Sequence, residues 1–251
     1  MERKFKIILS ILLVFSLLIG YQTATEVQSD LIQDELDEIY SLLAYSVVLK
    51  DWQTGGENQR GHNIGSVLVN PEGKVVFWAR NCNHITGNGT QHGEVRLMLG
   101  YLDKIRSYNL EGYTVYTTLE PCVQCSGMMI LTNIQRTVYG QTDPGFGKAL
   151  ERLALDSTKL PNGYEPYPRE VISDCSKCII CKKLDNAYNE TGGSLTGFLL
   201  SETAMEIFTE ANKMFLNYKV KYEINEKFYT EAKEFLKEEV TDSFKPLKPK
   251  I

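Results

Sequence analysis

The sequence lacks both an excess of positive charge and a hydrophobic segment long enough for a comfortable membrane span. Its 27 lysines and arginines are outnumbered by 32 aspartates and glutamates, which gives a formal net charge of −5 at pH 7. Polynucleotide-binding proteins usually need a positive surface, because neutralisation of phosphates supplies most of their affinity. The charge balance therefore favours a small-molecule substrate, although it does not exclude a local basic patch.

The apolar run near the N-terminus extends only from Ile7 to Gly20, whereas a membrane-spanning helix needs about 20 apolar residues. Basic residues precede the run, as they do in a secretory signal peptide. We therefore expect residues 1–25 to be a signal peptide or, alternatively, an uncleaved N-terminal anchor. Both alternatives place the rest of the chain outside the cytoplasm, in a secreted, periplasmic or membrane-anchored protein.

Two short segments, Gln91–Glu94 and Glu120–Cys125, combine the patterns HxE and PCxxC. A catalytic zinc ion takes three nitrogen or thiolate ligands and keeps one position open for water. His92, Cys122 and Cys125 supply such a set. Two cysteines at the first turn of a helix direct both sulfurs to one point, and the helix N-terminus favours their thiolate forms. The combined pattern predicts a catalytic zinc site more strongly than a CxxC pair alone.

Glu94 follows the histidine by two residues. This spacing lets a carboxylate reach water at the open position of the metal without becoming a ligand. Such a group can accept a proton from the water and deliver it to a substrate. We therefore predict that Glu94 is the catalytic proton carrier. The alternative is a protein that has lost this activity and keeps zinc only for the stability of its fold.

These residues resemble the cytidine and deoxycytidylate deaminase superfamily, most closely the branch of tRNA adenosine deaminases and bacterial guanine deaminases. The resemblance rests on HGEVRL at 92–97, TLEPCVQCSGMMI at 118–130 and TVYGQTD at 137–143, and it covers roughly residues 40–218. Gly93 stands where the family usually has alanine. The resemblance implies an α/β fold, namely a three-layer αβα sandwich with a central mixed five-stranded sheet, and Zn²⁺ as the cofactor.

Two further residues are candidates for contacts with the substrate. In the resembling family, an asparagine at the place of Asn81 hydrogen-bonds the substrate, with Asn83 as the other possible occupant of that place. The segment Asp143–Gly147 lacks the spacing and the Lys-Ser/Thr ending of a phosphate-binding P-loop. We interpret it as a loop at the rim of a pocket, where Phe146 is a candidate for stacking on a base.

The apolar spacing predicts a sequence of helices and strands around these motifs. Helices are expected over 30–49, 93–106, 203–218 and 225–240, and strands over 64–69, 75–79, 113–119, 137–140 and 194–200. Thr203 with Glu206 resembles a capping box for the third helix. The expected deaminase domain covers residues 26–218 and includes a cysteine-containing insertion near 160–193. A C-terminal helix and tail at 219–251 follow it.

Four cysteines do not belong to the zinc motif: Cys82, Cys175, Cys178 and Cys181. Three interpretations compete for them: disulfides, a second structural metal site, or free buried thiols. An exported chain favours disulfides for some of them, whereas bridges within a CxxC pair are strained and reducible. The sequence assigns no connectivity.

The motifs and the resemblance together predict a zinc-dependent hydrolase that deaminates a nucleobase or nucleoside and releases ammonia. Purines such as guanine or adenine are slightly favoured over cytosine. The expected partners are this small molecule and a second copy of the chain in a homodimer. Two alternatives remain: a secreted deaminase effector that acts on tRNA or DNA, and a non-catalytic zinc-binding module that acts through its C-terminal helices.

Overall fold

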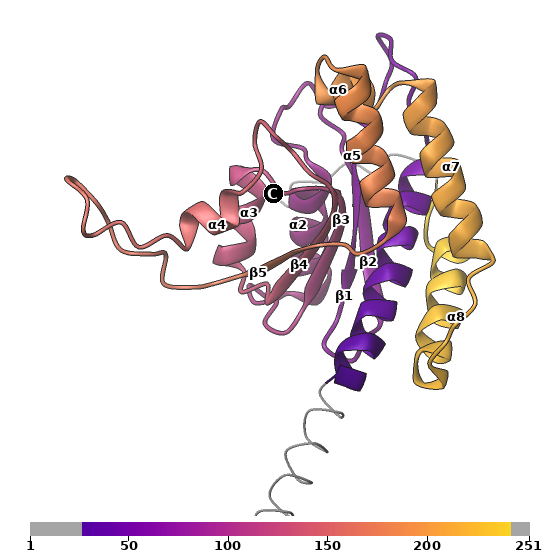
Figure 1. Cartoon of the computed structure of the whole chain (residues 1–251), viewed down its shortest axis with the longest axis horizontal. Coiled ribbons are helices and arrows are strands. Elements are labelled where there is room, and N and C mark those ends of the chain that lie inside the picture. The colour runs from indigo at the N-terminus through magenta and orange to yellow at the C-terminus, as the bar shows by residue number, and fades with distance from the viewer. Residues whose placement is uncertain (1–26, 242–251) are drawn as a thin grey trace, which may run out of the picture.

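The computed structural model describes residues 27–241, and Figure 1 shows their arrangement. The expected signal peptide or anchor at 1–25 and the C-terminal tail from Phe244 lie outside these residues. The first described helix covers residues 27–49 and is called the N-terminal helix below. None of the helices described between residues 27 and 241 is long and apolar enough to cross a bilayer.

Five strands form one mixed sheet in the order β2-β1-β3-β4-β5. The hairpin of β1 (Gly65–Val69) and β2 (Val75–Arg80) is antiparallel, and β1 also pairs antiparallel with β3 (Thr114–Leu119). The other strands, β4 (Arg136–Gln141) and β5 (Ile172–Cys175), run parallel to β3. The turn residues Asn70 to Gly73 close the hairpin, with Gly73 at a φ of 79° that suits glycine. This sheet confirms the predicted fold.

Helices cover both faces of the sheet and make three layers (Figure 1). On one face, α2 (Gly93–Ile105), α3 (Val123–Leu131) and α4 (Ala149–Leu153) share a core with Leu68 and Val115 of the strands. On the other face, the N-terminal helix packs with α5 (Ile179–Thr191), α7 (Glu202–Leu216) and α8 (Glu223–Glu238). The apolar faces of these helices are buried, which is the main source of their stability.

The predicted strand at 194–200 is wrong. Residues 195–198 form the short helix α6 (Leu195–Phe198), because the Ser194 side chain caps it by accepting a hydrogen bond from the Gly197 N–H. The fifth strand is β5, which lies inside the segment predicted to be an insertion. It is short and half exposed at the sheet edge, so it lacks the apolar alternation that marks a strand.

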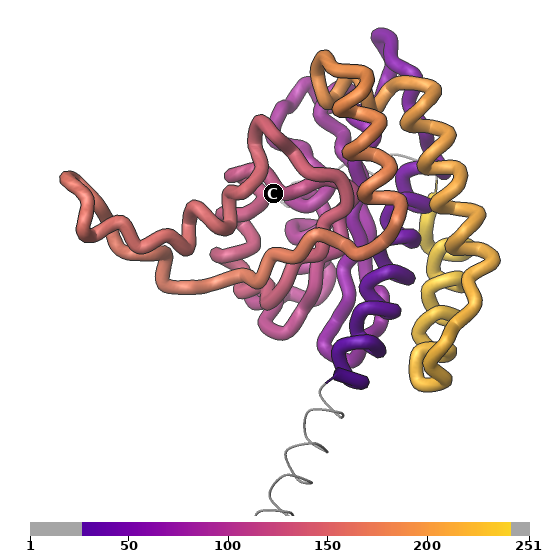
Figure 2. The backbone as a smooth tube through the Cα atoms, viewed as in Figure 1, coloured from indigo at the N-terminus to yellow at the C-terminus, as the bar shows by residue number. Residues whose placement is uncertain are grey.

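The insertion predicted near 160–193 stays a prediction, and part of that segment has regular structure. Residues 172–191 belong to the fold as β5 and α5, while the chain from 154 to 171 extends away from the body as an irregular arm (Figure 2). The capping box at Thr203 is also wrong, because Ser201 caps α7 by accepting from the Ala204 N–H. The C-terminal helix α8 packs in the same core as the N-terminal helix and α7, so it closes this layer of the domain.

Candidate active site

Three metal-binding side chains meet where two helices begin. His92 directly precedes α2, Cys122 directly precedes α3, and Cys125 lies in the first turn of α3. His92 and Cys122 both have extended backbone conformations, which turn the chain into each helix. The His92 Nδ1 atom lies 3.6 Å from each of the two sulfurs, and the sulfurs are 3.7 Å apart. The predicted ligands thus come together from segments 30 residues apart in sequence.

These distances fit a zinc ion. Tetrahedral coordination, with Zn–S distances of about 2.3 Å and Zn–N distances of about 2.0–2.1 Å, separates two sulfurs by about 3.8 Å and a nitrogen from a sulfur by about 3.6 Å. Within residues 27–241, no other group of three histidine, cysteine or acidic side chains brings its ligand atoms so close together. Three protein ligands leave one position open, as in catalytic zinc sites.

The two thiols titrate as a pair. Their hydrogen bond to each other lowers the pKa of Cys122 to about 4, and the hydrogen bond of Cys122 to His92 contributes to this lowering. The same contact raises the pKa of Cys125 well above its ordinary value, with burial acting in the same direction. In the metal-free protein these opposite shifts favour a single proton held by the pair. Zinc favours its release, because the thiolate is the ligand form.

Glu94 is buried beside the metal ligands and retains one free oxygen. The Thr117 hydroxyl donates to its Oε1 atom at 3.2 Å, whereas Oε2 has no hydrogen-bond partner within the described residues. Burial raises the pKa of the Glu94 carboxyl, because the charged form loses its hydration. His92 and Cys125 are close enough to contribute to these electrostatics. A carboxylate with one anchored and one free oxygen is suited to carrying a proton.

The comparison with known proteins matches the segment that contains the metal ligands and Glu94. The model for the cytidine and deoxycytidylate deaminase zinc-binding region matches residues 41–141. A probable cytosine deaminase of Schizosaccharomyces pombe is 33% identical over 117 residues, which are 44% of this chain and 70% of that protein. The chain belongs to this deaminase family. It is accordingly a zinc-dependent hydrolytic deaminase.

Other relatives differ in substrate. A tRNA-specific adenosine deaminase of Haemophilus influenzae is 26% identical over 147 residues, or 58% of this chain and 82% of that protein. A solved structure from a study of A-to-I editing by tRNA:A34 deaminases has a TM-score of 0.37 and 26% identity, covering 45% of this chain and 78% of that one. A guanine deaminase from Nitrosomonas europaea has a TM-score of 0.35 and 14% identity, covering 61% and 74%.

Asn81 of this deaminase holds the helix that follows His92. Its side-chain oxygen accepts a hydrogen bond of 2.6 Å from the backbone N–H of Gly93, the first residue of α2. A Cβ atom on Gly93 would lie 3.4 Å from this oxygen and from the Cα atom of Gly65, so the glycine permits a close approach. The contact of Asn81 with the substrate remains a prediction, for which the amide nitrogen and the second lone pair of the oxygen are available.

Glu120 fixes the loop of residues 142–148, which carries Phe146. One Glu120 oxygen accepts from the backbone N–H of Asp143 at 3.0 Å, and the other accepts from that of Lys148 at 2.8 Å. Gly147 lies so close to this carboxylate that a Cβ atom would be 2.1 Å from it. Phe146 is 71% exposed on the pinned loop. Its predicted stacking on a base remains a prediction, and the loop supplies the exposed aromatic face that stacking requires.

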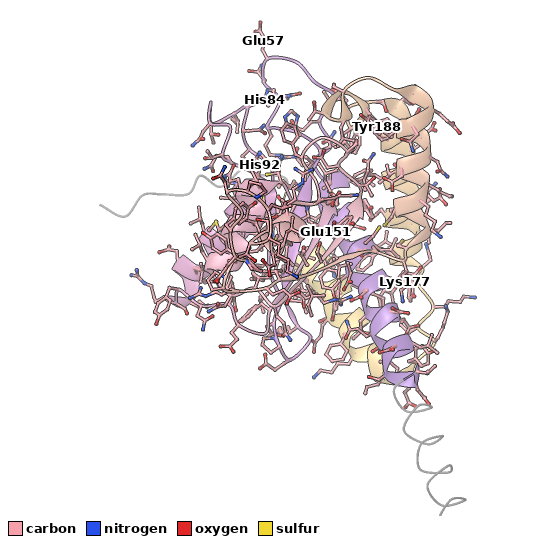
Figure 3. The ribbon with its side chains drawn as sticks, turned by 60° about the vertical axis from the view of Figure 1, so that its left-hand side comes forward. Glu57, His84, His92, Glu151, Lys177 and Tyr188 are labelled. Carbon is pink, nitrogen blue, oxygen red and sulfur yellow. The ribbon has the colours of Figure 1, made fainter. Side chains whose placement is uncertain are left out.

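Two histidines that sequence reasoning missed lie in the loops beside the metal ligands. We call residues 50–64, before β1, and residues 81–92, between β2 and α2, the rim loops. His62 belongs to the first and His84 to the second, and their ring centroids are 5.1 Å apart in an edge-to-face arrangement. Figure 3 shows His84 and His92 at one end of the molecule, near the loop tip that carries Glu57. The only sequence signal was that all three histidines of the chain lie between residues 62 and 92.

The remaining cysteines are free thiols. Cys178 directly precedes α5 and Cys181 lies in its first turn, both buried, and the Tyr45 hydroxyl lies 3.5 Å from the Cys181 sulfur. Cys175, at the end of β5, is exposed, and Cys82 is buried in a rim loop. The part of the chain described here contains no second three-ligand group, so the structure offers no support for a second metal site.

Proposed function

We propose that this deaminase acts on a free purine base or nucleoside, replacing an exocyclic amino group with a carbonyl oxygen and releasing ammonia. The chain's net charge of −5 favours a small substrate over a nucleic acid. Relatives named tRNA-specific adenosine deaminases support a purine over a pyrimidine, although the Schizosaccharomyces pombe relative is named as a probable cytosine deaminase.

The observation that carries the proposal is the free Oε2 atom of Glu94 beside the three metal ligands. His92, Cys122 and Cys125 would hold zinc, which supplies Lewis-acid activation of water when bound. Glu94 takes a proton from the attacking water and gives it to the ring nitrogen next to the reacting carbon, which makes that carbon electrophilic. It then takes the proton of the newly added hydroxyl group and gives it to the departing amino group, so that the carbonyl forms and ammonia leaves.

The chain's own residues hold Glu94 in position for these transfers. Thr117 fixes one carboxylate oxygen, and Asn81 fixes the start of the helix that carries Glu94. Burial excludes water from the carboxylate and raises its pKa, which brings the affinity for a proton closer to that required at neutral pH. The amide nitrogen of Asn81 is the proposed donor to the base.

A second candidate is deamination of a base within a polynucleotide. It is favoured by the exposed Phe146 on a rigid loop and by the relatives named tRNA-specific adenosine deaminases. The charge balance disfavours it. We also propose that residues 1–25 direct the chain out of the cytoplasm and that the active protein is a homodimer. N-terminal sequencing of the secreted fraction and sedimentation analysis test these two proposals.

Ammonia release tests the proposed function directly. Zinc-loaded protein is assayed against guanine, adenine, cytosine, their nucleosides, and single-stranded RNA and DNA oligonucleotides. Turnover of a free purine compound, lost in Glu94→Gln, supports the proposal. Turnover of oligonucleotides alone supports the second candidate. No turnover of any member of this panel contradicts both.

A further inference from the structure

His62 carries a buried polar atom that nothing in the fold explains. Its Nδ1 atom is buried and has no hydrogen-bond partner within residues 27–241. Buried polar atoms in folded proteins are nearly always paired, since an unpaired one costs the free energy of its lost hydration. Gln59 Oε1 and Asn83 Oδ1 of the same rim loops are also buried without a partner, and these three unpaired atoms together point to a polar molecule that completes the site.

The position of His62 is fixed by contacts between the two rim loops. The Ile85 N–H donates to the Arg60 carbonyl at 3.1 Å, and the Arg60 guanidinium donates to the Asn81 carbonyl. Arg60 is itself held by an ion pair of 2.7 Å with Asp51. On the other side of His62, the Asn81 N–H donates to the Ile64 carbonyl at 3.0 Å. Backbone contacts on both sides therefore fix the backbone of His62, whereas its imidazole can rotate about its side-chain bonds to bring Nδ1 to a ligand.

The same segment lies against the start of both metal-binding helices. Gly65, three residues after His62, touches Gly93 at the first position of α2. The Gly65 N–H donates to the Thr118 hydroxyl at 3.2 Å, on the strand that leads to Glu120 and Cys122. His62 thus lies three residues before the point at which β1 packs against the start of α2.

We infer that His62 hydrogen-bonds the base of the substrate through its Nδ1 atom and so contributes to substrate specificity. This inference rests on the proposed function, because it assigns a binding residue for that reaction. A neutral imidazole offers one N–H donor and one nitrogen acceptor, which suit the ring nitrogens, N–H groups and carbonyl oxygens at the edge of a nucleobase. Burial lowers the pKa of His62, which favours the neutral ring.

A site with a buried polar atom discriminates against ligands that leave the atom unpaired. His62 would therefore favour substrates with a polar atom on the edge of the base that faces the rim loops. His84 differs in this respect, because its ring nitrogens lie 2.9 Å from the Gln59 amide nitrogen. His84 thus provides a matched control: an imidazole in the same loop pair that already has a partner.

The first arm of the test is kinetic, on zinc-loaded protein with the best substrate from the ammonia panel. We expect His62→Leu to raise KM by about tenfold with little change in kcat, because it removes one hydrogen bond to the bound base. His62→Asn, which keeps a polar atom near the position of Nδ1, should restore most of the affinity, and His84→Leu should leave KM nearly unchanged. Melting temperatures show whether each variant is folded.

The second arm observes the imidazole itself. The chain has only three histidines, so the ring nitrogens of ¹⁵N-histidine-labelled protein give few NMR signals. In zinc-loaded Glu94→Gln, a saturating base should shift the Nδ1 signal of His62 and leave that of His84 in place. The His62→Leu variant assigns the signal, and a base that lacks the exocyclic amino group provides a non-reactive ligand.

The outcomes separate this inference from the proposed function. If the wild-type enzyme is active but His62→Leu has the wild-type KM, or His84→Leu raises KM equally, the role of His62 is refuted and the function stands. A base that binds without moving the His62 signal refutes it as well. If no compound in the panel is turned over, the proposed function fails, and the NMR arm alone decides whether His62 contacts a bound base.

Discussion

Replacing Glu94 with glutamine tests the proposed chemistry most directly. The two side chains have nearly the same shape, and the amide oxygen can still accept the hydrogen bond from Thr117 at the position of Oε1. The change therefore removes the proton acceptor at Oε2 and little else. A positioned general acid–base contributes about 10²- to 10⁴-fold to a rate, so kcat should fall by about that factor. Metal analysis should still find zinc, because Glu94 is not one of the three ligands.

In metal-free protein, Glu94→Gln should increase the stability of the fold, although it lowers activity. Burial raises the folded-state pKa of Glu94 above its value in the unfolded chain, so the folded state holds more protons between these two pKa values. Stability is therefore highest below the unfolded pKa and falls as the pH rises through the folded pKa. Glutamine carries no charge, so metal-free Glu94→Gln should melt at a higher temperature than wild type at pH 7. Full activity in the variant, or loss of zinc together with activity, would refute the assigned role.

Three further substitutions test the framework of the site. Cys122→Ser should lose zinc and activity together, as measured by metal analysis after dialysis, because two ligands hold the ion much more weakly than three. Asn81→Ala should destabilise the fold by about 0.5–2 kcal/mol in denaturant titration, because it leaves the Gly93 N–H unpaired at the helix start; an unchanged midpoint contradicts this. Gly140→Ala places a Cβ 2.0 Å from the Tyr45 hydroxyl oxygen, at a cost of about 1–3 kcal/mol that Tyr45→Phe should partly relieve.

The metal ligands and the main helices could be predicted because their signals are local. HxE and PCxxC each place ligands within one turn at a helix start, and the strand–helix–strand unit around Cys122 brings α3 beside the sheet. Strands such as β1 carry continuous apolar runs, since both of their faces are covered. The edge strand β5 has no such run, and the apolar run near Phe198 packs as a helical turn. Hydrophobicity alone does not distinguish these two outcomes.

Residue roles that depend on distant partners were harder to predict. Besides the predicted contact with the substrate, which stays a prediction, the Asn81 oxygen accepts from Gly93, twelve residues further along the chain. Glu120, next to the cysteine motif, holds a loop that begins more than 20 residues later. His62 has no periodic pattern around it, because it lies in a loop whose conformation depends on contacts with another loop. Such contacts have no signature in a single sequence.

The residues assigned to the family reaction and those proposed to select the substrate lie in different parts of the fold. The family match ends at residue 141, with the metal ligands and Glu94 inside it and the loop that carries Phe146 beyond it. The ligands and the proton carrier lie on helix starts held by the sheet, where small shifts are costly. Phe146 and His62 lie on loops pinned at a few points, where side chains can change without moving the metal. The reaction can therefore be assigned from the family, while the proposed roles of Phe146 and His62 place the choice of base in the loops, and the variants of His62 test that proposal.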